Sequence, residues 1–481
     1  MVWSSAGISE RTVQMVEILE FGILVGYALV LLAVGGHYAR RQSTAESFYL
    51  ADRSLGSFSV FGTTFSTFLG TGLVFTLGAF GYHHGVGGFV LVGVAVFGLV
   101  LFALAAPRLK RASDREAAVT LPALMGRYWG DRTVVLAALV TVSLFTGTLS
   151  ASFLVVGSLL EGLLGVPAPV ATVGFGVLIV GYTVIGGFRA VVVTDLIQMG
   201  CIVVGLVLVL PLLVLSTIGT PGSPTFSAHA GSLMPPLNLL VVYLLVGVFA
   251  FFGSQDLHQR VFAAESPREA RRGMLLFAGS LAIAGSVAVA LGIAATSLAP
   301  GTEGDRALVA LTESVARNGA LGLVLLGFLG LANSDADSQM LTVASNVTED
   351  LLPGFGGDSG DVGGVEAARV AVAGVGVAAI VVTVSAPNLV AVLGALGSWF
   401  AVLGLVVAAT LFWDRTTEQA AFAGLAVGYI LPIAFVSVTG EFGAAPVVGV
   451  VPAAAVLLGV SFLTGSGADS RFSHALDRWP L

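Results

Sequence analysis

Charged residues are scarce in this chain: Asp, Glu, Lys and Arg make up only 10% of its 481 residues, and Lys110 is the single lysine. Soluble globular proteins carry about 25% charged residues, so the composition excludes an ordinary soluble domain. Hydrophobic residues make up 56% of the chain, and the mean hydropathy is +0.97. We therefore expect an all-α membrane protein that crosses the bilayer many times.

Cysteine is nearly absent, and the common enzyme signatures are missing. Cys201 is the only cysteine, which excludes an intramolecular disulfide, and the six histidines form no HExxH motif. No phosphate-binding loop is present, and no nucleophile stands beside a base. The net charge is −7, so no basic surface for nucleic acid is expected. We expect no enzyme, no organic cofactor and no nucleic-acid partner.

Apolar runs dominate what is present. Thirteen segments are long enough to cross a bilayer, which takes about 20 helical residues. They cover residues 16–36, 57–81, 86–107, 133–163, 168–186, 190–216, 237–257, 273–299, 318–348, 365–386, 388–412, 418–438 and 443–464.

The basic residues predict the orientation of these spans. Of the 21 basic residues, only Arg11, Arg306 and Arg317 fall outside the connections on one side of the membrane. Cytoplasmic loops carry such an excess, so we expect a multi-pass cell membrane protein with its N-terminus outside and its C-terminus in the cytoplasm. Residues 1–16 lack a signal-peptide pattern, and the first span is expected to be retained.

The ninth apolar segment contains an unusual polar stretch. Ser334, Asp335, Asp337 and Ser338 interrupt it, and carboxylates inside a membrane are costly and functional. On a helical period Ser334, Asp337 and Ser338 share one face, with Asp335 on its flank. Such oxygen ligands suit a hard cation or a proton. The alternative is a loop with solvated acids, which the apolar flanks disfavour.

Two further segments predict broken helices. The span 57–81 contains five glycines among its hydroxyl residues, and the span 237–257 ends in Gly253, Ser254, Gln255 and Asp256. Unwound helices in a membrane free backbone groups and are tolerated where they line a cavity. A pair of such helices at matching positions of two halves is typical of transporters. Close helix packing would explain the glycines, but it would not explain Gln255 and Asp256.

A Gly-Gly pair and an acid mark the boundary of the sixth span. The sequence GGFRAVVVTDLIQ covers residues 186–198, with Gly186 and Gly187 as a predicted turn between two helices. Asp195 lies one turn or more inside the next helix, where it is a candidate cation ligand. The alternative is a surface ion pair between Asp195 and Arg189, and the sequence leaves both open.

Four stretches together resemble the sodium/solute symporter family, which includes the sodium/proline and sodium/sugar symporters. They are FYLADRSLG (48–56), GGFRAVVVTDLIQ (186–198), HQRVFAAESPREARRG (258–273) and NSDADSQMLTVASNVTEDL (333–351). The resemblance covers essentially the full chain. It implies one transporter domain with a LeuT-like five-plus-five inverted repeat, working as a monomer. The repeats would be residues 57–216 and 237–412, and the flanking helices 16–36, 418–438 and 443–464.

The resemblance also implies two cation sites. The main sodium site would use backbone carbonyls and side-chain oxygens of Ser66, Leu69, Leu331, Ser334 and Asp335. A second site, for sodium or a proton, would use Asp195, Ser334, Asp337 and Ser338. Asp335 and Asp337 depart from the family, which usually has Ser or Thr at the first position and Ser at the second. Both extra carboxylates are expected to act as sodium ligands, while a proton or a divalent cation remains an open alternative.

The solute site implied by the resemblance lies beside the two broken helices. Its candidate residues are Phe68, Thr71, Leu73, Phe251, Phe252, Ser254, Gln255 and Asp256. Asp256 replaces an aromatic gate of the sugar symporters, so it would bind an amine-bearing solute or join Arg260 in a cytoplasmic gate. Leu73 replaces a glutamine of the sugar symporters, which argues against a sugar.

The function expected from these features is symport of a small organic solute, coupled to sodium, by alternating access. Proton-coupled or divalent-dependent transport on the same scaffold is one alternative. A membrane sensor with the symporter fold is another, but the 17 residues after 464 are too few for a signalling domain.

Overall fold

A computed structural model describes residues 10–39, 42, 44–218, 237–315, 320–354, 364–385, 397–441 and 443–464. These residues are almost entirely helical and contain no β-strand, in agreement with the predicted all-α class. The helices of the first half are α1 (Glu10–Tyr38), α2 (Ala45–Leu50), α3 (Ser57–Phe68), α4 (Thr71–His84), α5 (Gly88–Glu116), α6 (Leu121–Leu164), α7 (Ala168–Ile202) and α8 (Leu210–Thr217). Those of the second half are α9 (Leu237–Gly253), α10 (Gln255–Ala263), α11 (Pro267–Leu298), α12 (Ala307–Val315), α13 (Ala320–Asn346), α14 (Leu352–Gly354), α15 (Val365–Ser385), α17 (Gly397–Phe412), α18 (Glu418–Thr439) and α19 (Ala445–Thr464).

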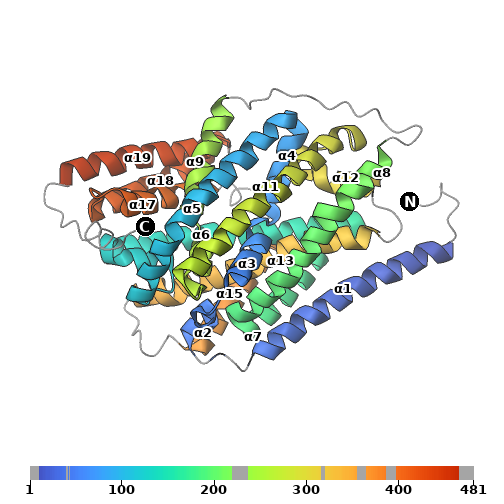
Figure 1. Cartoon of the computed structure of the whole chain (residues 1–481), viewed down its shortest axis with the longest axis horizontal. Coiled ribbons are helices and arrows are strands. Elements are labelled where there is room, and N and C mark those ends of the chain that lie inside the picture. The colour runs from blue at the N-terminus through green and yellow to red at the C-terminus, as the bar shows by residue number, and fades with distance from the viewer. Residues whose placement is uncertain are drawn as a thin grey trace.

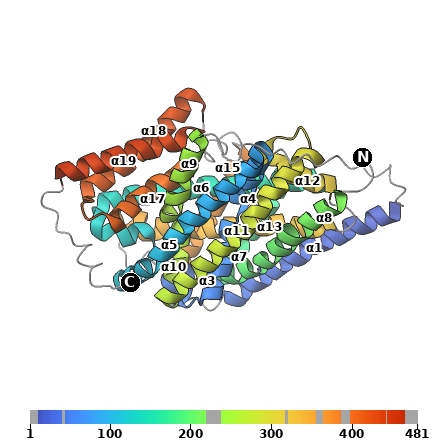
Figure 2. The same ribbon diagram turned by 45° about the horizontal axis from the view of Figure 1, so that its top comes forward.

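The helices pack into one bundle with α13 near its centre (Figure 1). In both views α1 lies along one edge, and α18 and α19 lie at the opposite edge (Figure 2). Around α13 lie α3, α6, α7 and α15, all of which contact it. The polar stretch of the predicted ninth span is therefore placed in the middle of the protein.

The described residues contain eight helices long and apolar enough to cross a membrane, or up to nine when the bent pair α9 and α10 is taken as one span. The chain is thus a multi-pass membrane protein. The number thirteen stays a prediction, because residues 386–396 of the tenth and eleventh predicted spans lie outside the described residues. The number also depends on how long helices with internal breaks are divided.

Both predicted helix breaks are present. The second predicted span divides into α3 and α4 at Leu69 and Gly70, and the seventh divides into α9 and α10 with a bend of 44°. At the second of these breaks Ser254 adopts an extended conformation, with φ −83° and ψ 104°. The glycine-rich and polar sequence at each break explains why the helix is interrupted there.

The boundary predicted at Gly186 and Gly187 also corresponds to a break. The helical run Ala168–Ile202 leaves helical dihedrals at Gly187, where φ is 57° and ψ is −165°. This region of dihedral space is essentially restricted to glycine. A Cβ at Gly187 would also lie 2.8 Å from Nε2 of Gln42, whose side chain donates to the Gly186 carbonyl.

Backbone and side-chain contacts fasten the two broken spans together at one end. Leu55, just before α3, pairs with the connection after α10, since its N–H donates to the Ala263 carbonyl at 3.0 Å. A carboxylate oxygen of Glu269 in α11 accepts from the Ser57 N–H at 2.7 Å and so caps α3. Two of the stretches that carry the family resemblance therefore contact each other.

The motif FYLADRSLG also contacts the end of the ninth span. Tyr49 in α2 hydrogen-bonds through its hydroxyl to Oγ1 of Thr348 at 3.0 Å, and its carbonyl accepts from Nε2 of Gln259 at 2.7 Å. Burial raises the pKa of the Tyr49 phenol, which therefore stays protonated at physiological pH. These contacts hold α2 against α10 and the segment Val347–Leu351 that follows α13.

Close approach of α4 and α11 gives the first prediction. A Cβ at Gly292 of α11 would lie 1.9 Å from the Gly78 carbonyl oxygen of α4, whereas a Cβ at Gly279 of α11 would meet nothing within 4 Å. Gly292→Ala is expected to force these helices apart and to lower the free energy of unfolding by about 1–3 kcal/mol. Gly279→Ala is the matched control. Equal thermal unfolding midpoints for the two variants would contradict the packing.

Candidate functional site

The polar stretch of α13 is buried, apart from one residue. Between Gly327 and Asn346 every residue is buried except Asp335, which is partly exposed. Ser334, Asp337 and Ser338 are 0% exposed. The side chains of this stretch contact partners on three sides of the helix. The four candidate ligands Ser334, Asp335, Asp337 and Ser338 therefore fall into three groups.

The first group, called the arginine cluster, joins four helices. Its members are Thr63 and Thr67 of α3, Asp195 of α7, Arg260 of α10, and Ser334 and Ser338 of α13; all but Thr67 are 0% exposed. Thr63 and Ser334 each donate a hydrogen bond to the Asp195 carboxylate. Oγ1 of Thr67 hydrogen-bonds with Oγ of Ser334 at 3.0 Å and of Ser338 at 3.2 Å. Asp195 therefore contacts Ser334 directly, whereas Ser338 is linked to it through Thr67 and Arg260.

Arg260 lies at the centre of this cluster. Its Nη2 donates to Oγ1 of Thr67 at 2.5 Å and to Oγ of Ser338 at 2.7 Å, and it lies 3.5 Å from a carboxylate oxygen of Asp195. A buried carboxylate needs such a charged partner. The arginine was not among the residues predicted for the cation sites.

The sequence suggested the ion pairs Asp195–Arg189 and Asp256–Arg260, but the structure instead contains the pair Asp195–Arg260. Arg189 donates to Oγ of Ser54 at 2.6 Å, so Asp195 pairs with Arg260 and not with Arg189. Arg260 meets Asp256 only at its backbone carbonyl, 3.1 Å away. The proposed side-chain gate between Asp256 and Arg260 is therefore not formed in this structure.

Asp337 faces a different neighbour. Its carboxylate accepts hydrogen bonds from the hydroxyl of Tyr182 in α7 and from Oγ of Ser338, the latter at 3.3 Å. Nδ2 of Asn333 donates to the same tyrosine hydroxyl at 2.8 Å. Asp337 thus adjoins the arginine cluster through Ser338, and Tyr182 is a further residue that the sequence did not single out.

Asp335 belongs to a separate group, called the Asp335 cluster. One carboxylate oxygen accepts from Oγ1 of Thr71 at 3.1 Å and from Oγ of Ser152 at 3.2 Å. The other accepts from Nε2 of Gln339 at 2.7 Å. Thr71 begins α4, so this carboxylate lies directly at the first helix break. No contact joins Asp335 to the Ser334 side chain among the described hydrogen bonds.

Two of the three carbonyl groups predicted for the main cation site, those of Ser66 and Leu69, belong to residues at the same break. The Gly70 N–H donates to the Thr67 carbonyl at 3.0 Å, although a continuous helix would direct it to the Ser66 carbonyl. The Ser66 carbonyl is therefore left without its usual helical donor. Oγ of Ser66 donates to the Asp195 carbonyl at 2.6 Å, which links the break to α7. Leu69 and Leu331 are both buried.

The residues predicted for the solute site divide into two sets. Phe68, at the end of α3, packs against Phe251 of α9 with ring centres 6.3 Å apart. Phe252 instead packs against Phe102 of α5, and Leu73 packs against the core. Only the first of these aromatic pairs stands at the helix break.

The polar candidates of the seventh span surround the second break. The Asp256 carboxylate, in the first turn of α10, accepts from the Ser254 hydroxyl and, at 3.0 Å, from the Leu257 N–H. Oε1 of Gln255 accepts from the Leu121 N–H of α6 at 2.5 Å. Gln255 is thereby directed to the start of α6, and its Nε2 has no partner.

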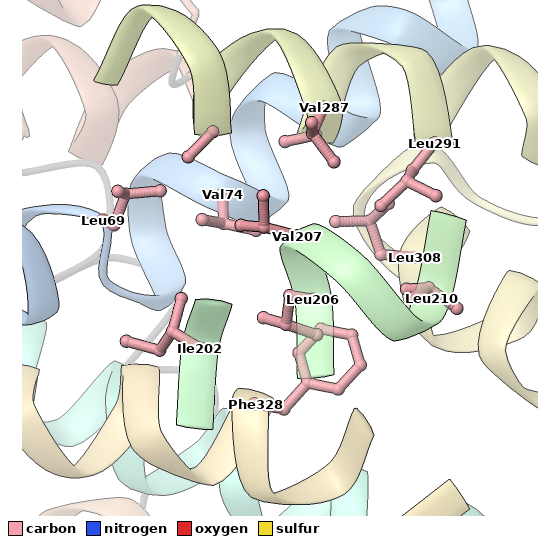
Figure 3. Close-up of a pocket in the computed structure, with 12 residues that line it drawn as sticks. Leu69, Val74, Ile202, Leu206, Val207, Leu210, Val287, Leu291, Leu308 and Phe328 are labelled. Carbon is pink, nitrogen blue, oxygen red and sulfur yellow. The ribbon is translucent and has the colours of Figure 1, made fainter. Parts of the chain in front are cut away.

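An apolar pocket lies on the other side of α4. It is lined by Leu69, Val74, Ile202, Leu206, Val207, Leu210, Ala284, Val287, Ala288, Leu291, Leu308 and Phe328 (Figure 3). None of these side chains offers a hydrogen-bonding group, so the pocket suits neither a cation nor a polar solute. In the described part of the chain no group of three or more His, Cys, Asp or Glu could hold a metal ion.

Buried charges that meet where two membrane helices break define a cation-coupled secondary transporter. Known proteins agree with this class. The sodium:solute symporter family model matches residues 48–428, and the chain belongs to this family. It is a secondary transporter, not an enzyme, and its activity is sodium-coupled symport of a solute.

Curated relatives cover most of the chain. The high-affinity proline transporter PutP of Bacillus subtilis (strain 168) is 25% identical over 424 residues, which are 83% of this chain and 88% of the relative. The sodium/proline symporter of Escherichia coli (strain K12) is 26% identical over 437 residues, 85% of this chain and 86% of the relative.

Solved structures share the fold. A Na⁺-coupled sialic acid symporter in a substrate-bound outward-open state matches with a TM-score of 0.78 and 18% identity, covering 92% of this chain and 98% of that one. A second match is Mhp1, a nucleobase-cation-symport-1 family transporter in a closed conformation with bromovinylhydantoin bound. Its TM-score is 0.57 and its identity 15%, and the match covers 89% of this chain and 98% of that one. The LeuT-like fold predicted from the sequence is confirmed.

Proposed function

We propose that this symporter binds sodium between the α3–α4 break and α13, and a small organic solute beside the same break. The observation that carries this proposal is the convergence of α3, α7, α10 and α13 on the buried arginine cluster. The main cation site would use the Ser66, Leu69 and Leu331 carbonyls with the Ser334 and Asp335 side chains. The second would use Asp195, Asp337 and Ser338.

The charges of the second site favour a monovalent cation. When ionised, Asp195 and Asp337 carry two negative charges, and Arg260 compensates one of them. One sodium ion would make this group neutral, whereas a divalent cation would leave an excess positive charge in the membrane interior. A proton on either carboxylate would balance the charge equally well, so proton coupling is the competing candidate.

The transport cycle follows from these positions. Sodium at the first break would draw α3 and α4 toward α13 and complete the solute site. Binding of both would favour closure on one side and opening on the other, because coupling is the extra affinity of sodium for the solute-bound state. Release of the solute and sodium into the cytoplasm would require the backbone pairing between Leu55, before α3, and Ala264, after α10, to loosen.

The remaining assignments are part of the same proposal. The inverted repeats would comprise residues 57–216 and 237–412, with the other helices flanking them. The excess of basic residues in alternate connections supports an external N-terminus and a cytoplasmic C-terminus in the cell membrane. The transporter would work as a monomer. Its family membership argues against a sensor built on this scaffold.

A stability screen tests this function. The purified protein is heated with each member of a panel of amino acids, amines, organic acids and sugars, in sodium or potassium chloride at two pH values. One solute class is expected to raise the unfolding temperature far more in sodium than in potassium. Equal stabilisation in both salts, or a requirement for low pH in place of sodium, would contradict sodium coupling.

A further inference from the structure

We infer that Tyr182 of α7 is a positioning residue for the second cation site: its hydroxyl holds the Asp337 carboxylate apart from Arg260, so that the negative charge stays available to sodium. This inference rests on the second site proposed above and adds a residue on which the affinity of that site depends. Tyr182 is not itself one of the proposed ligands. Its role follows from two hydrogen bonds, from the packing of α7 and from the charges around Asp337.

The phenol hydrogen of Tyr182 is directed at Asp337. Nδ2 of Asn333 donates to the phenol oxygen at 2.8 Å, and the phenol in turn donates to Oδ2 of Asp337. An amide NH₂ group only donates, so the phenol oxygen accepts that bond and its hydrogen is left for the carboxylate. Asn333 and Asp337 are one helical turn apart on α13, and all three side chains are 0% exposed. They form a directed chain of hydrogen bonds that is shielded from solvent.

Packing against α1 keeps Tyr182 in this place. A Cβ at Gly35 of α1 would lie 2.8 Å from the Tyr182 Cβ and 3.0 Å from its Cα. The two helices therefore touch backbone to backbone at this level, on the side of α7 where the tyrosine begins. The side chain extends from there to α13 and cannot leave the interface without displacing a helix.

The turn at Gly187 lets α7 reach α13 twice. Tyr182 before the turn donates to Asp337, and Asp195 after the turn accepts from Ser334. Tyr182 and Asp195 are 13 residues apart and would be separated by about 20 Å in a continuous helix. Their partners are only three residues apart on α13. The break therefore brings both side chains of α7 to one level of α13, where the second site is proposed.

Tyr182 stabilises the charge of Asp337 without cancelling it. A buried carboxylate requires hydrogen bonds or a positive partner. Asp337 accepts from Tyr182 and, at 3.3 Å, from Oγ of Ser338, and no ion pair joins it to a basic residue in the described part of the chain. An arginine would neutralise this carboxylate, whereas a phenol leaves its negative charge in place. That charge remains for a cation.

Arg260 is the competing partner of Asp337. Its Nη2 donates to Oγ of Ser338 at 2.7 Å, and the same Oγ donates to Asp337. One serine hydroxyl thus separates the guanidinium from the carboxylate. Opposite charges attract strongly where water is excluded. Without the phenol, Asp337 would be drawn to Arg260, and sodium would lose one of its proposed ligands to an internal ion pair.

Equilibrium binding of radioactive sodium to the purified full-length protein, without solute, tests this inference because it gives the number of sodium ions and the affinity of each. Tyr182→Phe removes only the hydroxyl. It is expected to weaken one sodium site about 10–100-fold, the typical cost of losing a partner that orients a ligand, and to leave the other site unchanged. Tyr49→Phe is the matched control, since Tyr49 is also 0% exposed and its hydroxyl bonds Thr348 at 3.0 Å.

A double variant separates positioning from a general loss of structure. Asp337→Ser removes the carboxylate that the phenol holds, so adding Tyr182→Phe to it should weaken sodium no further. If Tyr182→Phe lowered the affinity by the same factor with and without the Asp337 carboxylate, the tyrosine would be merely structural and the inference overturned. Unchanged sodium affinity in Tyr182→Phe, or an equal loss in Tyr49→Phe, would also overturn it.

A second single variant covers the case in which Tyr182→Phe does not fold. Asn333→Leu removes the donor behind the phenol and is expected to weaken the same sodium site; unchanged affinity in it would overturn the inference. The wild-type protein distinguishes this inference from the proposed function. A single sodium site in the wild type would overturn the second site and the inference with it, whereas no sodium binding at all would contradict sodium coupling itself.

Discussion

Arg260→Leu is expected to be among the most damaging single substitutions in this protein. The guanidinium donates to Thr67 and Ser338 and lies 3.5 Å from Asp195, with no exposure to solvent. Its removal leaves a buried carboxylate without a compensating charge, which costs about 3–5 kcal/mol. Thermal unfolding of the purified protein should show this loss, and transport should be abolished.

Partial rescue distinguishes the charge effect from simple loss of packing. The double variant Arg260→Leu with Asp195→Leu removes both charges and should recover part of the lost stability, although not transport. Arg189→Leu is the matched control, because Arg189 is an arginine of the same bundle that hydrogen-bonds to the Ser54 hydroxyl and pairs with no carboxylate among the described residues. If the double variant is as unstable as the sum of the two single variants, Asp195 and Arg260 are not coupled.

Asp195→Asn is expected to remove most of the sodium dependence of transport. Asp195 is fully buried and accepts hydrogen bonds from Thr63 and Ser334. Its carboxylate is one of the ligands of the proposed second cation site. Loss of a direct ligand should weaken sodium by more than the roughly 10–100-fold that an outer-shell partner typically costs. The sodium concentration for half-maximal uptake measures this change.

The control for Asp195→Asn is the same substitution at Asp414, which is exposed and far from α7 in sequence. The Asn variant leaves the buried Arg260 guanidinium without its carboxylate, so its unfolding temperature should fall even in the absence of sodium, whereas that of Asp414→Asn should change little. A variant with normal half-maximal sodium but reduced stability would show that Asp195 serves only to hold Arg260.

The helix breaks and the family were predictable because their signals are local. Glycine and polar residues inside the apolar run before Asp256 predict an unwound helix whatever tertiary structure the rest of the chain adopts. The motif with Gly187 and Asp195 likewise gave both a break and a buried acid. Long apolar segments predicted the all-α class, but not the exact number of spans.

The partners within the site were not predictable, because they depend on packing between distant segments. Arg260 is one helical turn from Asp256 and 65 positions from Asp195, yet its side chain pairs with Asp195. Asp335 and Asp337 are separated by about 200° around a helix, which already predicts that they face different neighbours. Only the arrangement of α4, α6 and α7 shows that these neighbours are Thr71 and Ser152 for one and Tyr182 for the other.

Uptake into proteoliposomes tests the central claim most directly. The vesicles contain the purified protein and are given an inward sodium gradient, with the solute identified by the stability screen outside. Sodium-coupled symport predicts transient accumulation of that solute above its external concentration, and no accumulation when potassium replaces sodium. Accumulation driven by an imposed pH gradient without sodium, or mere equilibration under every gradient, would contradict the account.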